Sequence, residues 1–385
     1  MVLKVVNWKI PLYRIFTDDD DIKSISSVLK RRMDWAIGPE IMQFEQSLAN
    51  YVGSKFCVSF NSGTSALHAS LLATKITKGD EVIIPSFTFV ATPNSVLMVN
   101  ARPRFADIDN NTLGLDPGDL VRHISTKTKA IIPVHYGGLA CKIEEISQIA
   151  KNKKICLIED AAESLGSHVN KKMTGTFGDM GIFSFAGNKV LTTGEGGAIV
   201  TDSESLYEKL KLIRSHGRKE NQSYFSSTQP PNYVSLGYNW RMSSITAALA
   251  LSQLKKLNKL IKLRRKNAQY LSANLGKFSE IRVPMEPNGY FHVYQLYSII
   301  LRNSRLRNTL QKFLTKKGIM SKVFFEPAHL TNFYKKEILQ QKLTLKNTES
   351  ISSRILTLPM FPEMTKKELD YICNSIREFF EKSRI

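Results

Sequence analysis

Short apolar segments alternate with segments of helical periodicity between residues 56 and 201, and this alternation constrains the fold more than any other feature of the sequence. The expected strands cover residues 56–60, 81–86, 104–109, 130–135, 155–159, 181–185 and 198–201, and the first expected helices between them cover residues 66–73 and 91–99. Strands separated by helices need crossover connections, which join parallel strands. The sequence therefore predicts an α/β fold with a large, mostly parallel sheet.

The two ends of the chain follow a different pattern. Helices are expected from Thr17, a candidate N-cap, to residue 32, and over residues 40–51, where apolar residues recur with helical spacing. A long helix is expected over residues 244–275, followed by strands at 294–301 and 322–325 and helices at 306–317 and 365–382. We therefore predict two domains: an N-terminal segment with the large α/β domain in residues 1–255, and a small α+β domain in residues 256–385.

Polar residues gather where the predicted strands end. They include residues 61–63, Ser86, His135, Asp160 and the segment that follows Phe185. Ligands of open α/β sheets bind at the carboxyl ends of the strands. We therefore expect these polar groups to form one cluster at that edge of the sheet.

Lys189 and Asp160 carry the most distinctive chemistry of this edge. Lys189 lies between an apolar strand and a glycine-rich segment, and Asp160 closes another apolar strand. A lysine amine can form a Schiff base with an aldehyde cofactor, and an aspartate can hold a pyridinium nitrogen protonated, which makes the ring an electron sink. Most lysines are solvated surface charges, but together the two residues suggest pyridoxal phosphate chemistry.

A glycine turn between a strand and a helix, Ser62-Gly-Thr-Ser65, suggests a phosphate site. Backbone N–H groups and hydroxyls at the start of a helix suit a phosphate, and Ser184 could supply a further hydroxyl. The alternative is an ordinary capped turn. Phe87 and Phe89 follow a strand, and each is either a residue that stacks on a flat ring or a residue of the core.

The composition is that of a globular protein with an excess of positive charge. The 385 residues carry a formal net charge of +20, which favours anionic partners such as nucleotides. The alternative is a chain that is lysine-rich throughout, and the basic stretch 255–266 fits the solvated face of a helix better than a nucleic-acid surface. No helix-turn-helix, zinc finger or RNA-binding signature accompanies the charge, which argues against a nucleic-acid-binding protein.

Cysteines, histidines and apolar runs indicate which other classes do not fit. The four cysteines form no C-x-x-C pair and the seven histidines form no H-x-x-x-H pattern, so neither a disulfide framework nor a metal site is predicted. No apolar run approaches the length of a membrane span, and the N-terminus lacks the layout of a signal peptide. We therefore expect a cytoplasmic protein.

The order of the motifs resembles the DegT/DnrJ/EryC1/StrS family of sugar-nucleotide aminotransferases, which share the aspartate aminotransferase fold of fold type I pyridoxal phosphate enzymes. Each motif is short, but their common order extends over nearly the whole chain. The matching segments are SGTSAL at 62–67, GDEV at 79–82, PSFTF at 85–89, PVHYG at 133–137, EDAA at 159–162, SF at 184–185, GNK at 187–189, TGEGG at 193–197 and GYNWRM at 237–242.

The resemblance implies a cofactor, pyridoxal 5'-phosphate (PLP), and a role for each matching residue. Lys189 matches the Schiff-base lysine and proton shuttle, Asp160 the partner of the pyridinium nitrogen, and Phe89 the aromatic that stacks on the ring. The residues that match the phosphate-binding turn and strand end are Gly63, Thr64, Ser65 and Ser184.

Two further matches concern the neighbouring subunit and the cofactor ring. Asn239 matches an asparagine that reaches the phosphate from the partner, which implies a homodimer with shared active sites. Glu163 stands where the family often has glutamine near the ring hydroxyl, and an ionised carboxylate there can only accept hydrogen bonds.

The resemblance also implies an activity. Some relatives have histidine in place of the lysine and act as dehydratases, so Lys189 favours amino transfer. The lysine segment looks most similar to perosamine-synthase-like members, which aminate C4 of a GDP-linked 4-keto-6-deoxyhexose. The expected amino donor is L-glutamate, and the expected contacts to the sugar nucleotide are Trp35, Gly38 and His329. A UDP- or dTDP-linked keto sugar stays open as substrate, and so does a non-catalytic regulator with the same fold.

Overall fold

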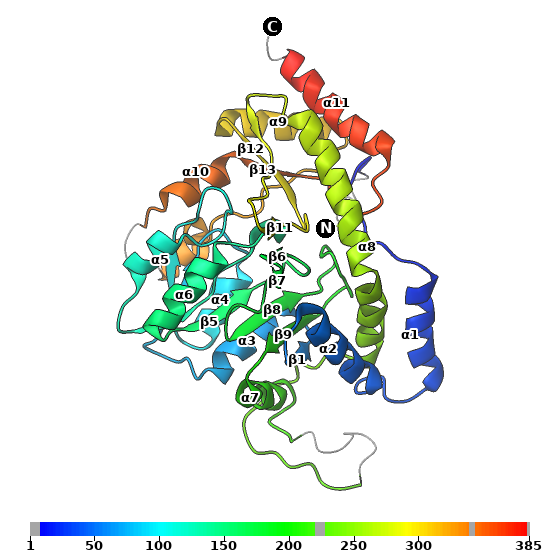
Figure 1. Ribbon diagram of the computed structural model, residues 1–385, viewed down its shortest axis with the longest axis vertical. Coiled ribbons are helices and arrows are strands. Elements are labelled where there is room, and N and C mark those ends of the chain that lie inside the picture. The colour runs from blue at the N-terminus through cyan, green and yellow to red at the C-terminus, as the bar shows by residue number, and fades with distance from the viewer. Residues whose placement is uncertain (1–7, 220–227, 339–342, 383–385) are drawn as a thin grey trace.

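A seven-stranded sheet forms the centre of the large part of the molecule (Figure 1). The computed structural model describes residues 8–219, 228–338 and 343–382. Along the sheet the strands are β1 (Phe56–Phe60), β9 (Gly197–Thr201), β8 (Met180–Ser184), β5 (Cys156–Asp160), β4 (Thr128–Ile131), β2 (Glu81–Pro85) and β3 (Arg102–Ala106). Strand β9 runs antiparallel to both of its neighbours, and the other pairs are parallel. The prediction of a mostly parallel α/β sheet is therefore confirmed.

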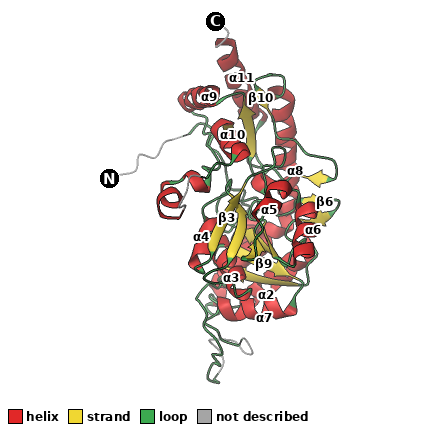
Figure 2. Cartoon of the chain, turned by 90° about the vertical axis from the view of Figure 1, so that its left-hand side faces the viewer, coloured by secondary structure: helices red, strands yellow, loops and turns green. Residues whose placement is uncertain are grey.

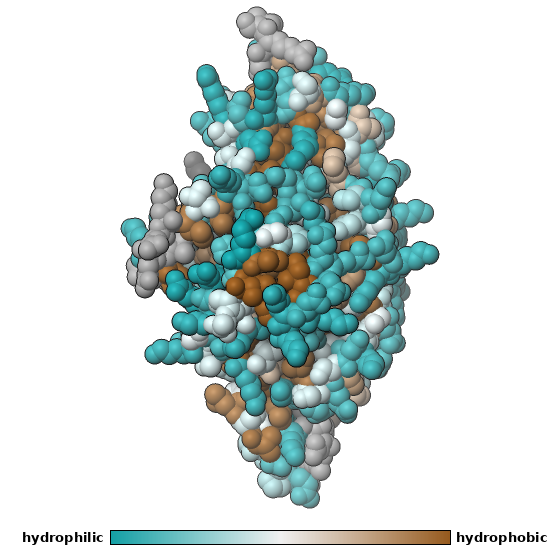
Figure 3. Space-filling model, turned by 60° about the vertical axis from the view of Figure 1, so that its left-hand side comes forward, coloured by the Kyte–Doolittle hydropathy of each residue, from teal (hydrophilic) through white to brown (hydrophobic). Residues whose placement is uncertain are grey.

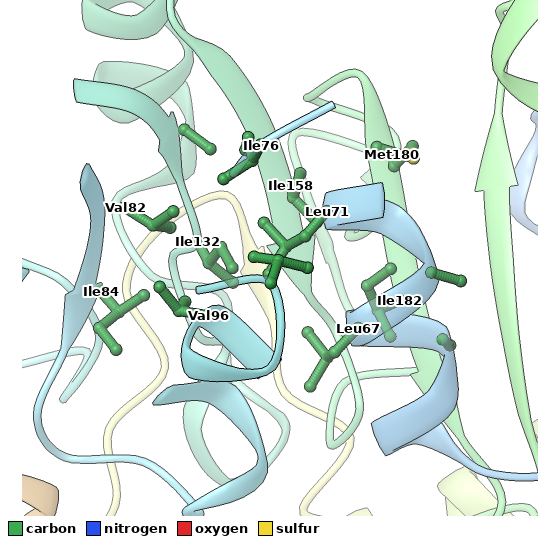
Figure 4. Packing of buried hydrophobic residues seen from close by; sticks show 14 of the residues in the cluster. Leu67, Leu71, Ile76, Val82, Ile84, Val96, Ile132, Ile158, Met180 and Ile182 are labelled. Atoms are coloured by element: carbon green, nitrogen blue, oxygen red, sulfur yellow. The ribbon is translucent and has the colours of Figure 1, made fainter. Parts of the chain in front are cut away.

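Helices cover both faces of this sheet (Figure 2). One face packs against α3 (Gly63–Ala73), α4 (Ala91–Met98) and α7 (Glu204–Arg214), and the other against α2 (Pro39–Val52), α5 (Pro117–His123) and α6 (Ile143–Lys153). Successive strand residues point to opposite faces, so Val82 and Ile84 join the cluster around Leu71 of α3 (Figure 4), whereas Ile83 joins the cluster on the other side. Burial on both faces explains why the strands are continuous apolar runs.

The C-terminal part is built around a second, antiparallel sheet. This sheet has the order β10 (Ile281–Arg282), β12 (Tyr297–Leu301) and β13 (Ile355–Leu358), and α9 (Ser304–Lys316), α10 (Lys346–Arg354) and α11 (Lys366–Lys382) accompany it. A third small sheet joins β11 (Tyr290–Phe291), β6 (His168–Val169) and β7 (Lys172–Met173). The short helices are η1 (Tyr136–Gly138), η2 (Ala328–Leu330) and η3 (Tyr334–Ile338).

The helix α8 (Ser244–Leu275) connects the two parts, and its bounds are those predicted from the sequence. Its buried residues up to Ile261 belong to a cluster with β1, β8 and β9, whereas those from Ala268 onward belong to a cluster with β12 and β13. The N-terminal helix α1 (Asp19–Arg31) packs along α8. The division of the chain at residue 255 stays a prediction.

Several bounds of the sequence-based assignment are wrong by a few residues, and three differences have a reason in the contacts. The N-cap of α1 is Asp18 and not Thr17, because the Asp18 carboxylate accepts from Asp20 N while Asp21 returns a bond to Asp18 N. The segment 322–325 is not a strand, since only Lys322 pairs with β13. Strand β4 ends at Ile131, and beyond Pro133, which has no N–H for the ladder, only Val134 pairs with β5, in an isolated bridge to Asp160.

The surface is mainly hydrophilic, although a compact apolar area interrupts it on the face shown in Figure 3. Among the described residues, no helix combines the length and the apolar character that crossing a membrane requires.

Candidate active site

The carboxyl ends of β1, β2, β5 and β8 lie at the same edge of the sheet, because these strands are parallel to one another. Most of the predicted site residues follow these strand ends. Asp160 is the last residue of β5, Ser184 is the last residue of β8, and Gly63 begins the helix that follows β1. The topology thus brings together residues that are more than a hundred positions apart in the sequence.

The predicted phosphate-binding turn lies at the N-terminus of α3. Ser62 is its N-cap: the Ser62 hydroxyl accepts from Ser65 N at 3.1 Å and lies 2.9 Å from the Ser65 hydroxyl. The amides of Gly63 and Thr64 precede the first helical hydrogen bond, so they are free to bind an anion, and the helix dipole favours one there.

Glycine is required where the cradle meets the next strand end. A Cβ on Gly63 would lie 3.0 Å from the Ser184 Cβ, so the turn and the Ser184 hydroxyl approach closely only without a side chain. A Cβ on Gly197 of β9 would lie 2.5 Å from the Ser62 carbonyl carbon. The backbone of Ser-Gly-Thr-Ser is therefore packed directly against Ser184, and its role as a phosphate site stays a prediction.

Asp160 is a buried carboxylate with few partners. It is 5% exposed, and it accepts hydrogen bonds from the Thr92 hydroxyl at 2.8 Å and from Ala162 N at 3.2 Å. Burial raises its pKa, an effect that the two hydrogen bonds and the charge of Lys189 oppose. A carboxyl group in this environment is stabilised in its charged form by a cationic partner.

Lys189 points toward the same edge. Its side chain is 14% exposed, and Nζ lies 3.4 Å from Glu163 Oε1. The other oxygen of Glu163 accepts from Gly137 N at 2.8 Å. The lysine therefore has a carboxylate neighbour that is itself fixed by the backbone.

The two candidate aromatic residues have different environments. Phe87 is fully buried and stacks on Tyr136 with ring centroids 4.9 Å apart, so it belongs to the core. Phe89 is 58% exposed at the end of the same segment, with Phe325 at 6.0 Å. Of the two, only Phe89 has a ring face that a ligand can reach.

The remaining predicted residues have structural contacts of their own. Asn239 is exposed, between Tyr238 and Trp240, whose rings stack at 3.9 Å. Trp35 donates from its indole to the Val28 carbonyl, and Gly38 caps α2, where a Cβ would lie 2.7 Å from the Ser244 hydroxyl. These contacts explain both residues structurally, and their contact with substrate stays a prediction.

Two histidines are held inside the protein: His329, a predicted substrate contact, and His135, a predicted member of the polar cluster. The His329 ring is 1% exposed and lies 2.6 Å from the Ser86 hydroxyl, and burial lowers its pKa. His135 is fully buried and lies 2.9 Å from Glu159, so the expectation that it joins the cluster is wrong. The substrate contact of His329 stays a prediction.

The comparisons with known proteins agree with this geometry. The DegT/DnrJ/EryC1/StrS aminotransferase family matches residues 16–377. The chain belongs to this family. It is 34% identical to GDP-perosamine synthase of Escherichia coli O157:H7, with 96% of this chain and 98% of that protein covered.

Solved structures extend the similarity to three dimensions. The aminotransferase PseC of Helicobacter pylori, involved in the biosynthesis of pseudoaminic acid, has a TM-score of 0.90 at 29% identity, covering 97% of this chain and 99% of that one. The PLP form of the putative sugar aminotransferase Spr1654 of Streptococcus pneumoniae has a TM-score of 0.89 at 26% identity, covering 97% and 99%. The protein is therefore a PLP-dependent sugar aminotransferase of the DegT/DnrJ/EryC1/StrS family.

The residues of this family member fit PLP. The buried Asp160 carboxylate has the environment that a pyridinium nitrogen would complete, and the amides and hydroxyls beside Gly63 and Ser184 are donors suited to a phosphate. Lys189 would supply the amine. Within the described residues, no cluster of three His, Cys, Asp or Glu side chains could hold a metal ion.

Sequence reasoning missed the residues that support the aminotransferase site. Thr92 bonds Asp160, and the Thr88 hydroxyl in turn lies 2.8 Å from the Thr92 hydroxyl. Thr88 lies three residues after the end of β2, a position that could have marked it as a candidate, and Thr92 lies in the first turn of α4. Gly137 donates to Glu163 through its backbone amide. The sequence contains no pattern that marks such a donor, because a backbone donor does not depend on residue type.

Proposed function

We propose that this aminotransferase moves an amino group from L-glutamate to a GDP-linked 4-keto-6-deoxyhexose. The observation that carries the proposal is the convergence of Lys189 and the buried Asp160 at one edge of the sheet, in a chain that is 34% identical to a GDP-perosamine synthase. When bound, PLP supplies an electron sink that lets a proton leave the Cα of an amino acid.

The protein side chains hold the cofactor and move the proton. With PLP bound, Asp160 would keep the pyridinium nitrogen charged, the turn at Gly63 and the Ser184 hydroxyl would hold the phosphate, and Phe89 would cover a ring face. In its neutral form, the Lys189 amine takes the proton from the donor Cα. Glu163 lies 3.4 Å from Lys189 Nζ and orients that amine.

The site is shared between two subunits in this proposal. Asn239 is exposed on a segment whose backbone is fixed on both sides, because Tyr238 N donates to the Ile213 carbonyl and Trp240 N to the Arg214 carbonyl. An exposed side chain on a rigid segment is suited to reach a partner's phosphate. The net charge of +20 supports a diphosphate substrate, and Trp35, Gly38 and His329 are the proposed contacts to it.

The test is to assay amino transfer from glutamate to GDP-, UDP- and dTDP-linked 4-keto sugars, with Lys189→Ala beside wild type. The exposed lysine Lys262 of α8 provides the control variant Lys262→Ala. Lys189→Ala is expected to lose both turnover and the near-visible absorption of the bound cofactor, and Lys262→Ala to keep both. Turnover with only a UDP- or dTDP-linked sugar would show that the substrate carries that nucleotide and not GDP. Cofactor binding without turnover on any sugar would favour the regulator.

A further inference from the structure

The peptide unit that precedes Lys189 is held from both sides, and one of the two holding groups comes from the C-terminal part of the chain. Its N–H, which belongs to Lys189, donates to the Ala186 carbonyl at 2.9 Å within the lysine segment. Its carbonyl, which belongs to Asn188, accepts from the side-chain amide of Gln295 at 2.7 Å. The position of the Lys189 Cα therefore depends on one local bond and one long-range bond.

Gln295 is itself rigid. Its side chain is buried, with the residue 3% exposed, and its backbone carbonyl lies 3.4 Å from a guanidinium nitrogen of Arg264. The same nitrogen donates to the Tyr294 carbonyl at 3.2 Å and to the Met360 carbonyl at 3.1 Å. Arg264 thus fixes the segment around Gln295 to α8.

The segment 293–296 also holds the backbone at Gly137, whose amide binds Glu163. Val293 N donates to the Gly138 carbonyl and Leu296 N to the Gly137 carbonyl, each at 3.0 Å. A Cβ on Gly138 would lie 2.8 Å from Gln295 N, so the two backbones are in close contact. Because Gly137 N bonds Glu163, one short segment contacts the supports of both members of the Lys189–Glu163 pair.

We infer that Gln295 is a positioning residue for Lys189. Its side chain fixes the lysine segment while its backbone neighbours fix Gly137, so that it sets the relation between Lys189 Nζ and Glu163. The inference rests on the proposed role of Lys189. Reactions that depend on orientation are sensitive to displacements on the order of 1 Å, and the Gln295 bond acts on the peptide adjacent to the lysine Cα.

Gln295→Met tests this inference, because methionine has nearly the same length and no amide donor. The matched control is Asn267→Leu: Asn267 of α8 is 5% exposed and donates to the Phe361 and Pro362 carbonyls at 2.9 and 3.1 Å, which are buried amide–carbonyl bonds to carbonyls outside the lysine segment. Gln295→His is the conservative variant, since imidazole Nε2 can donate from a comparable position.

We expect Gln295→Met to lower kcat about tenfold, with the KM for the keto sugar within about twofold of wild type. The pH midpoint of the absorption band of the bound cofactor, which reports on its linkage to Lys189, should shift. Gln295→His should restore most of the rate and the wild-type midpoint. Asn267→Leu should lower the thermal unfolding temperature and leave kcat and the midpoint unchanged.

The inference is overturned if Gln295→Met matches Asn267→Leu, that is, if both keep the wild-type kcat per folded molecule and the same midpoint. If Gln295→Met does not fold, Gln295→Ala removes the same donor with a smaller side chain and gives the same two readouts. Lys189→Ala separates the two proposals. An active Lys189→Ala contradicts the proposed function, whereas an inactive Lys189→Ala with a normal Gln295→Met contradicts this inference alone.

Discussion

Glu159 and Asp160 are adjacent carboxylates at the end of β5, and the fold surrounds them differently. Each is buried. Glu159 faces the side of Leu157, where it accepts from the His135 ring and from the amides of Gly175, Phe177 and Gly178. Asp160 faces the opposite side and, among the described residues, accepts from only Thr92 and Ala162 through its carboxylate.

The number of hydrogen-bond donors separates Glu159, which has a structural role, from Asp160, which has the proposed role in the active site. Four donors converge on Glu159, so its charge is stabilised by the protein alone. Asp160 has half as many donors and a pKa that burial raises, so its charged form depends on a further cation. Burial of an acid is thus a poor indicator of function unless its partners are counted.

The largest effect is expected from Asp160→Asn. The amide keeps an oxygen for the Thr92 hydroxyl but cannot hold a pyridinium nitrogen protonated, so the amino-transfer rate should fall on the order of a thousandfold, within the range of lost electrostatic stabilisation. Steady-state assays measure this loss, and circular dichroism checks the fold. A variant that retains more than a tenth of the wild-type rate would show that the charge of Asp160 is not required.

Glu159→Gln should affect stability instead of chemistry. The Cys141 amide donates to His135 Nδ1, which leaves the proton on Nε2, so all four groups around Glu159 are donors. The amide nitrogen of glutamine would face some of them. We expect a loss of about 3 kcal/mol in the free energy of unfolding and an unchanged rate per folded molecule. Urea unfolding measures the loss, and a variant with wild-type stability would contradict the structural role.

The pH dependence of stability should also distinguish the two acids. Because burial raises the pKa of Asp160, the cofactor-free folded protein retains a proton that the unfolded chain releases near its ordinary pKa of about 3.9. Stability is therefore lost as the pH rises through the folded-state pKa. The unfolding temperature of cofactor-free wild type should fall relative to that of Asp160→Asn over this range. If the unfolding temperatures of the two proteins changed with pH in parallel, burial would not raise the pKa of Asp160 in the folded protein.

The sequence was sufficient to find Asp160 and insufficient to interpret Glu159. Both follow the same apolar run, and the pattern placed an acid at a strand end without showing which face each side chain occupies. That information comes from the packing of β5 between two layers of helices. The assignment of His135 to the polar cluster failed for the same reason, since strand ends predict location along the sheet but not the facing side.

Local chemistry limited the other predictions. Thr17 and Asp18 are both good N-caps, and the reciprocal bond from Asp21 decided between them. Ser184, Lys189 and Gly63 could be predicted as site residues because residue type and position after a strand both mark them. Gly137 and Gln295 act through a backbone amide and a single long-range bond, and neither leaves a local pattern.

The smallest effect is expected at Glu163, which combines features of both acids. One of its oxygens is bound by the Gly137 amide, as the oxygens of Glu159 are bound by backbone amides, and the other faces Lys189 Nζ at 3.4 Å. Glu163→Gln keeps an oxygen for Gly137 and a polar group for the lysine and removes only the charge. We therefore expect kcat to change by less than about threefold, the scale of one modest hydrogen bond. Glu163→Leu, which also removes the acceptor for Gly137, should reduce kcat further. If Glu163→Gln instead reduces kcat as strongly as Asp160→Asn, the negative charge beside Lys189 is itself required, and two acids of this site depend on charge.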